Sequence, residues 1–335
     1  MPKLTQNFEQ PLHGVDSFGK VAFNKPLRRA RLLPFFASLD PCLIGIEACA
    51  TSHHWGRELS ALGHNVKLMP PAYVKPYVKR GKSDAADAEA VCEAVTRPTM
   101  RFVEIKSENQ QAMLCQHRAR EIMVRQRTQL SNAIRGLIGE FGIILKKGAH
   151  YLRRFAQDVH RGQLPAIPEI GQAVILSLCE QLLSLHGRVK QMDKAIASQA
   201  RTDPRIKLLQ TIPGIGPINA SAIVATIGSA QHFKSGRDFA AWIGLTPLNR
   251  SSGGKERLGK ISRKGDRYLR KLLVVGMTAR LRVAARKPDE VDPWTANILK
   301  QKPRRVATIA MANKTARIIW AVLTKNEPFK PQQFA

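Results

Sequence analysis

The chain has 335 residues, 44% of them hydrophobic, and a formal net charge of +29. This length and apolar content allow two or three domains with separate cores. The charge, from 54 Lys and Arg against 25 Asp and Glu, is spread along the chain and predicts a polyanionic partner. Nucleic acid is the first candidate and an anionic membrane surface the second. We expect no transmembrane helix, since no apolar run approaches ~18 residues, and no secretory signal, since the first ten residues lack an apolar segment.

The cysteines predict a reducing compartment and exclude a C-x-x-C type of structural zinc site. Their number is odd, their spacing is wide, and no C-x-x-C motif occurs. Most are expected to be small buried apolar residues. The five positions are Cys42, Cys49, Cys92, Cys115 and Cys179.

Residues 1–105 predict a mixed α/β domain. Apolar runs bounded by glycine and proline suit short strands, and helix caps mark the helices between them. The expected elements are a hairpin of Val15–Phe18 with Lys20–Phe23, a strand at Pro41–Glu47, a helix from His53 to Leu62 that ends at Gly63, a strand at Asn65–Met69, and a helix at Asp84–Val95 capped by Ser83.

Three acidic residues are candidates for a metal site. Glu47 ends the apolar strand, and Asp84 and Asp87 share one face at the start of a helix. Their carboxylates could hold Mg²⁺, which acts with phosphates. Asp84 and Asp87 could instead serve only to stabilise the helix N-terminus through its dipole. The basic segment that ends at Lys82 suits a nucleic-acid backbone and favours the metal site.

Residues 106–203 predict long helices. Ser107-Glu-Asn-Gln110 has the spacing of a capping box and opens the first of them. We expect its arginines, chiefly Arg118 and Arg125, to bind nucleic acid, because few acids along the helix compensate them; a solvated face is the alternative. The arginines are Arg118, Arg120, Arg125, Arg127 and Arg135.

The clearest periodicity lies in residues 171–200. Apolar residues recur there at spacings of 3 and 4, which is the a/d pattern of a coiled coil. The pattern covers about three heptads, so self-association and an intramolecular helical hairpin are both open. The positions are Ile175, Leu178, Leu182, Leu185, Val189, Met192 and Ile196.

Residues 204–335 predict a mostly helical domain that begins with a helix-hairpin-helix motif. Its turn holds Gly214 and Gly216 before an apolar helix to Ile227, and amide groups at such a helix start can bind phosphate. A tight turn that only packs is the alternative. Further helices are expected at Phe239–Leu245, Arg267–Arg286 and Arg304–Leu323.

The paired serines Ser251 and Ser252 lie within the most basic part of this domain. Two glycines follow them, so the backbone can approach a ligand closely, and the cations favour phosphate. A hydroxyl in such a field is a candidate nucleophile toward a phosphodiester. A phosphate-binding loop without chemistry is the alternative. The candidate phosphate contacts are Lys255, Arg257, Lys260, Arg263 and Lys264.

The whole chain resembles a known family. The segments carrying the resemblance are PCLIGIEACAT from Pro41, MPPAYVKPYVKRGKSDAADAEAVCEAVTRP from Met69, IPGIGPINA from Ile212, and GLTPLNRSSGGKERLGKISRKGDRYLRKLL from Gly244. In this order, over about residues 13–325, they resemble the bacterial insertion-sequence transposases of the family numbered one hundred and ten. Those recombinases have an RNase H-like "DEDD" domain and a C-terminal serine-bearing domain, and a structured bridge RNA guides them.

The resemblance implies roles for the candidate residues. Glu47 looks like the second DEDD carboxylate, and Asp84 and Asp87 look like the third and fourth. Ser252 looks like the nucleophile, with Ser251 the close runner-up, and it would form a phosphoserine link to DNA. The resemblance also implies Mg²⁺ as cofactor, DNA and a guide RNA as partners, a homodimer or homotetramer, and a location in the bacterial cytoplasm at the nucleoid.

One departure concerns the first family carboxylate, which lies on an N-terminal strand that this sequence does not contain. The chain opens where the family's second strand begins, so we expect an RNase H-like domain without its first strand and a recombinase of low activity. Asp16 falls in the hairpin and is a poor substitute for the missing ligand. The expected fold is therefore α/β at 1–105, helical with a coiled coil at 106–203, and helical at 204–335. A non-catalytic nucleic-acid-binding protein and a metal-dependent junction nuclease are the alternative functions.

Overall fold

The computed structural model describes residues 9–79, 83–249, 251, 257–287 and 291–331. They belong to two compact units, one ending at Asn109 and the other beginning at Gln110. The expected boundary near residue 105 lies close to this division. The expected boundary at residue 203 lies inside the second unit and stays a prediction.

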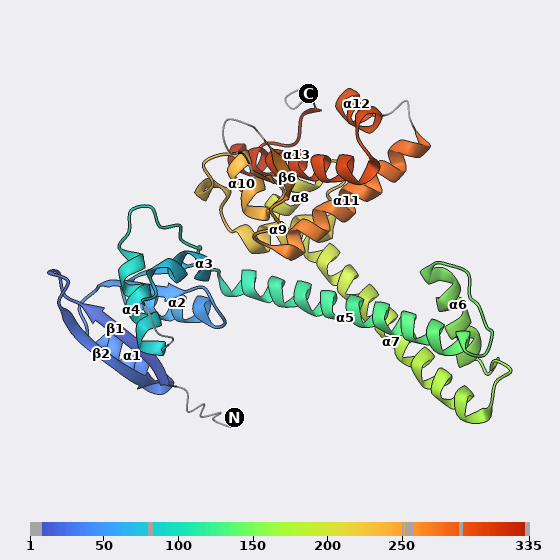
Figure 1. The fold of residues 1–335 in the computed structure, drawn as a ribbon, viewed down its shortest axis with the longest axis horizontal. Coiled ribbons are helices and arrows are strands. Elements are labelled where there is room, and N and C mark those ends of the chain that lie inside the picture. The colour runs from blue at the N-terminus through green and yellow to red at the C-terminus, as the bar shows by residue number, and fades with distance from the viewer. Residues whose placement is uncertain (1–8, 80–82, 250, 252–256, 288–290, 332–335) are drawn as a thin grey trace. The chain divides into compact units, whose positions relative to one another are not determined.

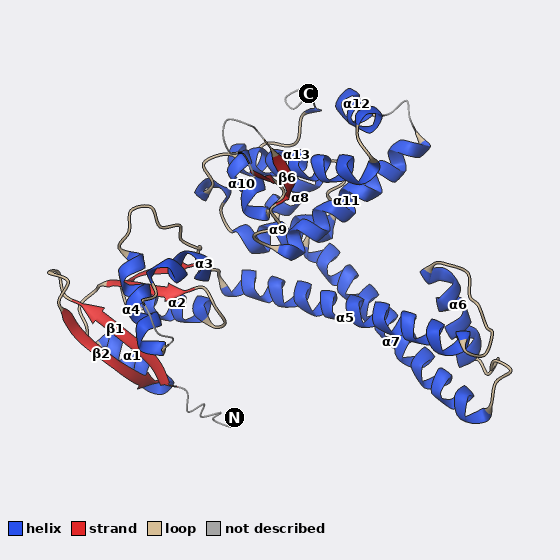
Figure 2. Cartoon of the chain, viewed as in Figure 1, coloured by secondary structure: helices blue, strands red, loops and turns tan. Residues whose placement is uncertain are grey.

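The first unit is mixed α/β, as expected (Figures 1 and 2). Four of its elements match the predicted ones closely. The hairpin also forms, but its strands are longer than expected, and the first ends at Val15, where the predicted strand began. Its elements are β1 (Glu9–Val15), β2 (Val21–Arg28), α1 (Arg29–Ala37), β3 (Leu43–Glu47), α2 (Ser52–Ala61), β4 (Asn65–Met69), α3 (Pro71–Val74), η1 (Lys75–Tyr77) and α4 (Asp84–Val95). Helix α1 was not predicted, because Pro34 inside it argues against a helix.

Helix α4 packs closely on the parallel pair of strands β3 and β4. A Cβ atom at Gly45 in β3 would lie 2.9 Å from Cβ of Val95 and about as close to Cε of Met69. The absence of a side chain at Gly45 therefore lets the helix approach the strand. On the other side of the pair, Ile44 and Val66 pack with α1 and α2.

The strands of the first unit form two separate two-stranded sheets. β1 pairs with β2 antiparallel, β3 pairs with β4 parallel, and no ladder among the described residues joins β1 to β3. Helix α4 contacts both β1 and β3. This arrangement is compatible with an RNase H-like domain that lacks a strand, and the missing strand stays a prediction.

Asp16 has a structural task at the tip of the β1–β2 hairpin. Its Oδ1 atom accepts hydrogen bonds from the backbone N–H groups of Phe18 and Lys20, each at 2.9 Å. A carboxylate that closes a turn in this way is engaged by the backbone. Asp16 thus has a structural role in the turn, and its exclusion from the metal site stays a prediction.

The second unit begins with three helices: α5 (Glu108–Gly139), α6 (Ala149–His160) and α7 (Glu169–Gln199). They share one core, formed by residues such as Ile134 of α5, Ala156 of α6 and Cys179 of α7. The apolar stripe predicted in residues 171–200 faces the inside of the unit at five of its seven positions: Ile175, Leu182, Leu185, Val189 and Ile196 are buried. The intramolecular alternative therefore accounts for the periodicity.

The rest of the second unit is a helical bundle with one small hairpin (Figures 1 and 2). Its elements are α8 (Pro204–Gln210), α9 (Pro217–Ile227), η2 (Ala230–His232), α10 (Gly236–Ile243), β5 (Pro247–Asn249), β6 (Leu258–Ile261), α11 (Arg267–Arg286), α12 (Pro293–Gln301) and α13 (Arg304–Lys325). The core is built around Phe239, Ile243, Met277 and Ile319.

Helix α13 is the one helix among the described residues that is long and apolar enough to cross a membrane by length and composition alone. Its buried residues, among them Met311, Ala312 and Ile319, belong to the core of the bundle. A core helix of a folded domain meets the same two criteria.

Candidate active site and nucleic-acid interface

Two predicted carboxylates stand at the start of helix α4. The hydroxyl of Ser83 accepts a hydrogen bond from the N–H of Ala86 at 3.2 Å, so the helix begins where the sequence predicted. Asp84 and Asp87 are exposed in its first turn. Within the described residues, neither carboxylate has a hydrogen-bonding or ion-pair partner.

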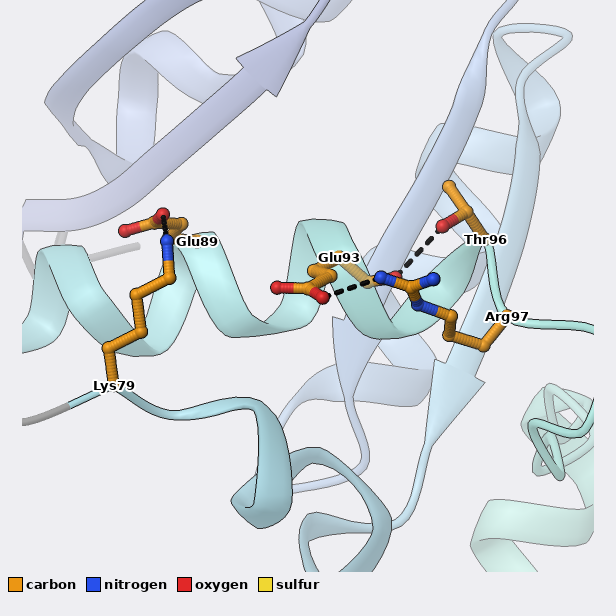
Figure 3. Close-up of polar contacts among 5 residues, drawn as sticks. All are labelled: Lys79, Glu89, Glu93, Thr96 and Arg97. Carbon is orange, nitrogen blue, oxygen red and sulfur yellow. Dashed lines mark hydrogen bonds and ion pairs between the residues drawn. The ribbon is translucent and has the colours of Figure 1, made fainter. Parts of the chain in front are cut away.

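The other acids of α4 are engaged by cations (Figure 3). Lys79 donates to Glu89 at 2.5 Å, and Arg97 donates to Glu93 at the same distance. The hydrogen bond from Lys79 lowers the pKa of Glu89. The helix therefore carries two paired carboxylates, which serve the fold, and two at its start that are available to a ligand.

Glu47 lies at the end of β3, opposite Met69 of β4, and is half-buried. Carboxylate oxygens suit Mg²⁺, so the donor chemistry of the three predicted acids fits the metal. Among the described residues, however, no three acidic, His or Cys side chains are gathered into a set that could hold an ion. Asp84 and Asp87 are brought together, and Glu47 is not joined to them in such a set. The assignment of Glu47 stays a prediction.

The serine loop is closed by strands β5 and β6, which pair antiparallel. Asn249 accepts a hydrogen bond from the N–H of Ser251 at 2.8 Å, and the hydroxyl of Ser251 accepts one from the N–H of Arg257 at 3.1 Å. Ser251 therefore links the two ends of the loop through hydrogen bonds. Ser252 and Lys255, like Lys82 of the first unit, lie outside the described residues.

The segment after β6 is fastened to helix α10 by close backbone contacts. A Cβ atom at Gly244 would lie 2.0 Å from the carbonyl oxygen of Lys264, and Gly244 has a φ of +81°. Only glycine fits both demands. Arg270 donates to the carbonyl of Ile243 at 2.6 Å and holds the same junction. Arg263 also has a positive φ, of 54°. Strain of this kind persists only where the surroundings hold it, as the contacts of Gly244, Lys264 and Arg270 do here.

A groove of about 1800 Å³ runs between the β5–β6 hairpin, the first turn of α10 and one face of α13. The predicted residues Lys260 and Arg263 line it. They are joined there by three cations that sequence reasoning did not single out: Arg237, Lys314 and Arg317. These three lie 26 to 54 residues from Arg263 along the chain, so no local pattern could reveal them.

The arginines of α5 have different tasks. Arg118 and Arg125 are exposed and, being seven residues apart, lie on one face of the helix, which suits the predicted nucleic-acid surface. Arg120 instead pairs with Asp193 of α7. Arg135 donates to three backbone carbonyls, those of Leu145, Lys146 and Gly148, at 2.9 Å each. Contrary to the expectation from sequence, part of the positive charge on this helix is compensated by the fold.

The turn between α8 and α9 packs against α11. Gly214 has a φ of +87°, and its carbonyl oxygen would lie 2.4 Å from a Cβ atom at Gly276. This close approach and the positive φ explain Gly214 without any ligand, whereas a Cβ atom at Gly216 would meet no atom within 4 Å. Gly214 and Gly216 are nevertheless exposed, so the turn is open to solvent on its other side. Phosphate binding at this turn stays a prediction.

A buried polar chain that the sequence did not reveal joins α5, α9 and α11. The ring of His117 lies 3.1 Å from the hydroxyl of Ser221 through Nε2 and 3.1 Å from the hydroxyl of Tyr268 through Nδ1. His117 and Ser221 are 1% and 0% exposed, so substrate cannot reach them. These three hydrogen-bonded side chains therefore join the helices, although a His between two hydroxyl groups is also a pattern found in catalytic sites.

The titration of His117 predicts a loss of stability in acid. Burial, and then the nearby Arg120 guanidinium, lower the pKa of His117 from 6.5 to about 4. As the pH falls from 6.5 to about 4, the unfolded chain gains a proton that the folded chain does not, so the free energy of unfolding decreases, by on the order of 3 kcal/mol. Below that range this group has no further effect. Urea unfolding at several pH values measures the slope, and His117→Gln, which cannot titrate, should lack this component. Parallel curves for the two proteins would refute the assignment.

Comparisons with known proteins give a consistent result. The family described as "Transposase IS116/IS110/IS902 family" matches residues 206–291, and an IS110-type DEDD domain described as "Transposase" matches residues 17–142. DEDD-type transposase domains generally use a divalent metal ion and fit an RNase H-like fold.

Two relatives match almost their whole length to this chain, and a third matches about three quarters of its length. A "Probable family 20 transposase" of Pseudomonas aeruginosa is 44% identical over 96% of this chain and 95% of its own length. The "Transposase for insertion sequence element IS1328" of Yersinia enterocolitica is 35% identical over 95% and 94%. A "Pilin gene-inverting protein" of Moraxella bovis is 24% identical over 84% and 76%.

Proposed function

Because the chain belongs to the IS116/IS110/IS902 family of insertion-sequence transposases, we propose that it cuts and rejoins DNA through a covalent bond between Ser252 and a DNA phosphate. The observation that carries this proposal is the loop clasped by Ser251 and Arg257, which belongs to a hairpin lined by cations. In the first step, the serine hydroxyl attacks the phosphorus, and the 3′ or 5′ oxygen of the DNA leaves with a proton. The reverse attack by a DNA hydroxyl releases the serine, so the energy of the bond is kept for rejoining.

The role of Ser251 supports Ser252 as the nucleophile. The hydroxyl of Ser251 accepts the N–H of Arg257 and closes the loop, a structural task that would have to be given up for attack. Lys260 and Arg263 carry charges on the same hairpin that would stabilise a phosphoryl group during the transfer. A relative named as a gene-inverting protein is in keeping with strand exchange.

We also propose that Asp84, Asp87 and Glu47 hold Mg²⁺. When bound, the ion would neutralise charge on the phosphate oxygens. Mg²⁺ is usually held by one or two protein carboxylates together with substrate phosphates. Asp84 and Asp87 are exposed and have no partner among the residues that the structure describes, which supports their availability for such a site.

The remaining proposals concern partners. The resemblance to bridge-RNA-guided recombinases and the exposed Arg118 and Arg125 on α5 support binding of a structured guide RNA. The backbone amide groups at the turn of Gly214 and Gly216, where α9 begins, would add a phosphate contact if this turn acts as a helix-hairpin-helix. A homodimer or homotetramer is proposed from the resemblance alone.

A covalent adduct tests the proposed function. Purified protein would be incubated with labelled DNA, guide RNA and Mg²⁺, and then denatured. A labelled band at the mass of protein plus DNA supports the serine mechanism. Cleavage of DNA without such a band would instead favour a metal-dependent nuclease, and binding without either would favour a passive binding protein.

Phosphate contacts should make binding strongly dependent on salt. With a net charge of +29, we expect about six phosphate contacts on duplex DNA, which gives a slope near −5 for log affinity against log salt. Titrations from low to high salt, followed by fluorescence anisotropy, measure this slope. A flat dependence would contradict phosphate-dominated binding.

A further inference from the structure

The groove beside the serine hairpin is too large for a small ligand. Its volume of about 1800 Å³ exceeds the range of roughly 300 to 1,000 Å³ typical of small-molecule sites. One wall is the β5–β6 hairpin from Leu258 to Ile261, and the other is the face of α13 from Val306 to Ala321. A groove of this size suits a segment of a polymer.

The positive charges of the groove favour an anionic polymer as its ligand. Five cations line it, and none of its described lining residues is acidic. Arg237, Lys260, Arg263 and Arg317 are exposed. Lys314 is half-buried at the same face, where burial lowers its pKa, so an anionic ligand would stabilise its charged form. The lining therefore matches a chain of phosphates.

The same groove also has an apolar and aromatic part. Trp294 lines it, with the ammonium group of Lys314 lying 4.3 Å from the centre of the ring. Leu258 and Val306 line it too, and they are 73% and 51% exposed. Duplex DNA offers mainly phosphates to such a surface, because its bases are stacked inside. An unpaired strand offers phosphates and base faces together, which is the combination that this lining would bind.

Trp294 is held in place by the start of α12. Asp292 caps the helix by accepting the N–H of Thr295 at 3.0 Å, and Arg280 of α11 donates to the same carboxylate at 2.6 Å. The hydroxyl of Thr295 donates to Asp292 at 2.7 Å. Trp294 lies directly before Thr295 and two residues after Asp292, so its backbone is held on both sides and needs little ordering when a ligand binds.

We propose that this groove binds a segment of unpaired, single-stranded DNA. The cations hold the phosphates, and Trp294 with its apolar neighbours contacts one or more bases. The choice of DNA over RNA rests on the proposed function, in which the adjacent serine loop acts on DNA; the choice of an unpaired strand rests on the groove itself. Strand exchange requires that bases leave their partners, and a groove for unpaired bases would hold them meanwhile.

Binding of matched oligonucleotides to the full chain tests this proposal. The probes are a thymine-rich DNA strand, the corresponding RNA strand and a DNA duplex, with affinity measured by fluorescence anisotropy. Trp294→Leu should weaken binding of the DNA strand by roughly 5- to 150-fold, which is the range for loss of one base–aromatic contact. Trp294→Phe keeps an aromatic ring and should retain most of the affinity. Thermal unfolding of both variants shows whether the fold is kept.

A second experiment tests the cations of the groove, with a control outside it. Lys314→Gln with Arg317→Gln should weaken binding of the DNA strand by at least tenfold. Arg282→Gln with Arg286→Gln removes two charges from exposed positions of α11, outside the groove, and should have a much smaller effect. Duplex binding should change little more in the groove variants than in this control.

Each other outcome would overturn the proposal. Equal losses for duplex and single strand would make the groove a general phosphate surface. A Trp294-dependent affinity for RNA but not DNA would assign it to RNA. Loss of self-association in Trp294→Leu, with DNA binding intact, would assign it to a second copy of the chain. Because these assays need no covalent adduct, single-strand binding could hold even if the serine mechanism failed, and the two failures are distinguishable.

Discussion

Replacing Ser252 by alanine is expected to abolish the covalent protein–DNA adduct while leaving binding of DNA and RNA nearly unchanged. Without the hydroxyl, no atom at that position can form the bond to phosphorus, so we expect adduct formation to fall at least ~1,000-fold. The side chain loses one oxygen and no charge, so phosphate contacts are kept. The adduct is measured as labelled DNA that stays with the denatured protein, and binding is measured separately by anisotropy.

Ser251→Ala is the matched control, because it removes the neighbouring hydroxyl. It would break the hydrogen bond from the N–H of Arg257 that closes the loop. Loss of one such bond is worth about 1 kcal/mol, so we expect at most about a tenfold decrease in the adduct. An adduct that survives in Ser252→Ala but disappears in Ser251→Ala would move the nucleophile by one residue. Survival in both variants would end the serine mechanism.

Replacing Asp84 and Asp87 together by asparagine should remove most of the divalent-metal binding of the protein–DNA complex. Loss of an outer-shell partner already lowers metal affinity by about 10- to 100-fold, and loss of two direct ligands should cost roughly a hundredfold or more. Mn²⁺, whose free and bound forms are distinguished by electron paramagnetic resonance, serves as the probe. Binding should also be weaker without DNA, because DNA phosphates supply part of the coordination.

Glu89→Gln with Glu93→Gln is the control for this experiment. It removes the same charge from the same helix, but at carboxylates that Lys79 and Arg97 already occupy. Metal affinity should stay within a few-fold of the unaltered protein. If both double variants lose metal equally, the effect is one of net charge alone. Unchanged binding in the aspartate variant would remove Asp84 and Asp87 from the metal site, and Glu47→Gln tests the third carboxylate in the same way.

Local patterns predicted most elements because the responsible interactions are local. The helix at Asp84–Val95 begins at its Ser83 cap, and the strand at Asn65–Met69 ends at Pro70, as expected. The elements that sequence reasoning missed are those whose stability comes from packing. Helix α1 contains Pro34 and is held by Leu32 and Phe36 in the core. Helix α6 is held by Leu152, Ala156 and Val159 in the same manner.

The candidate site was predictable only in part. Ser251, Asp84 and Asp87 attract attention because they stand beside glycines, cations or a helix start, which are features of neighbouring residues. The task of Ser251 as a clasp could not be predicted, because it depends on where Arg257 returns to the hairpin. Arg120 and Arg118 look alike in the sequence, and only the pairing of Arg120 with Asp193 separates a structural arginine from an exposed one.

The sequence by itself determined the charge, the order of the helices and strands, and the family, since these depend on composition, on short-range periodicity and on motifs read along the chain. The tertiary structure decided which residues meet. It brought Arg237, Lys314, Arg317 and Trp294 to the groove beside Lys260 and Arg263, from positions up to 80 residues apart. It also turned the apolar stripe of α7 inward and joined His117 to Ser221 and Tyr268. Such contacts depend on which apolar helix faces pack against one another. A pattern of neighbouring residues shows that a helix has an apolar face, but not which element that face will contact.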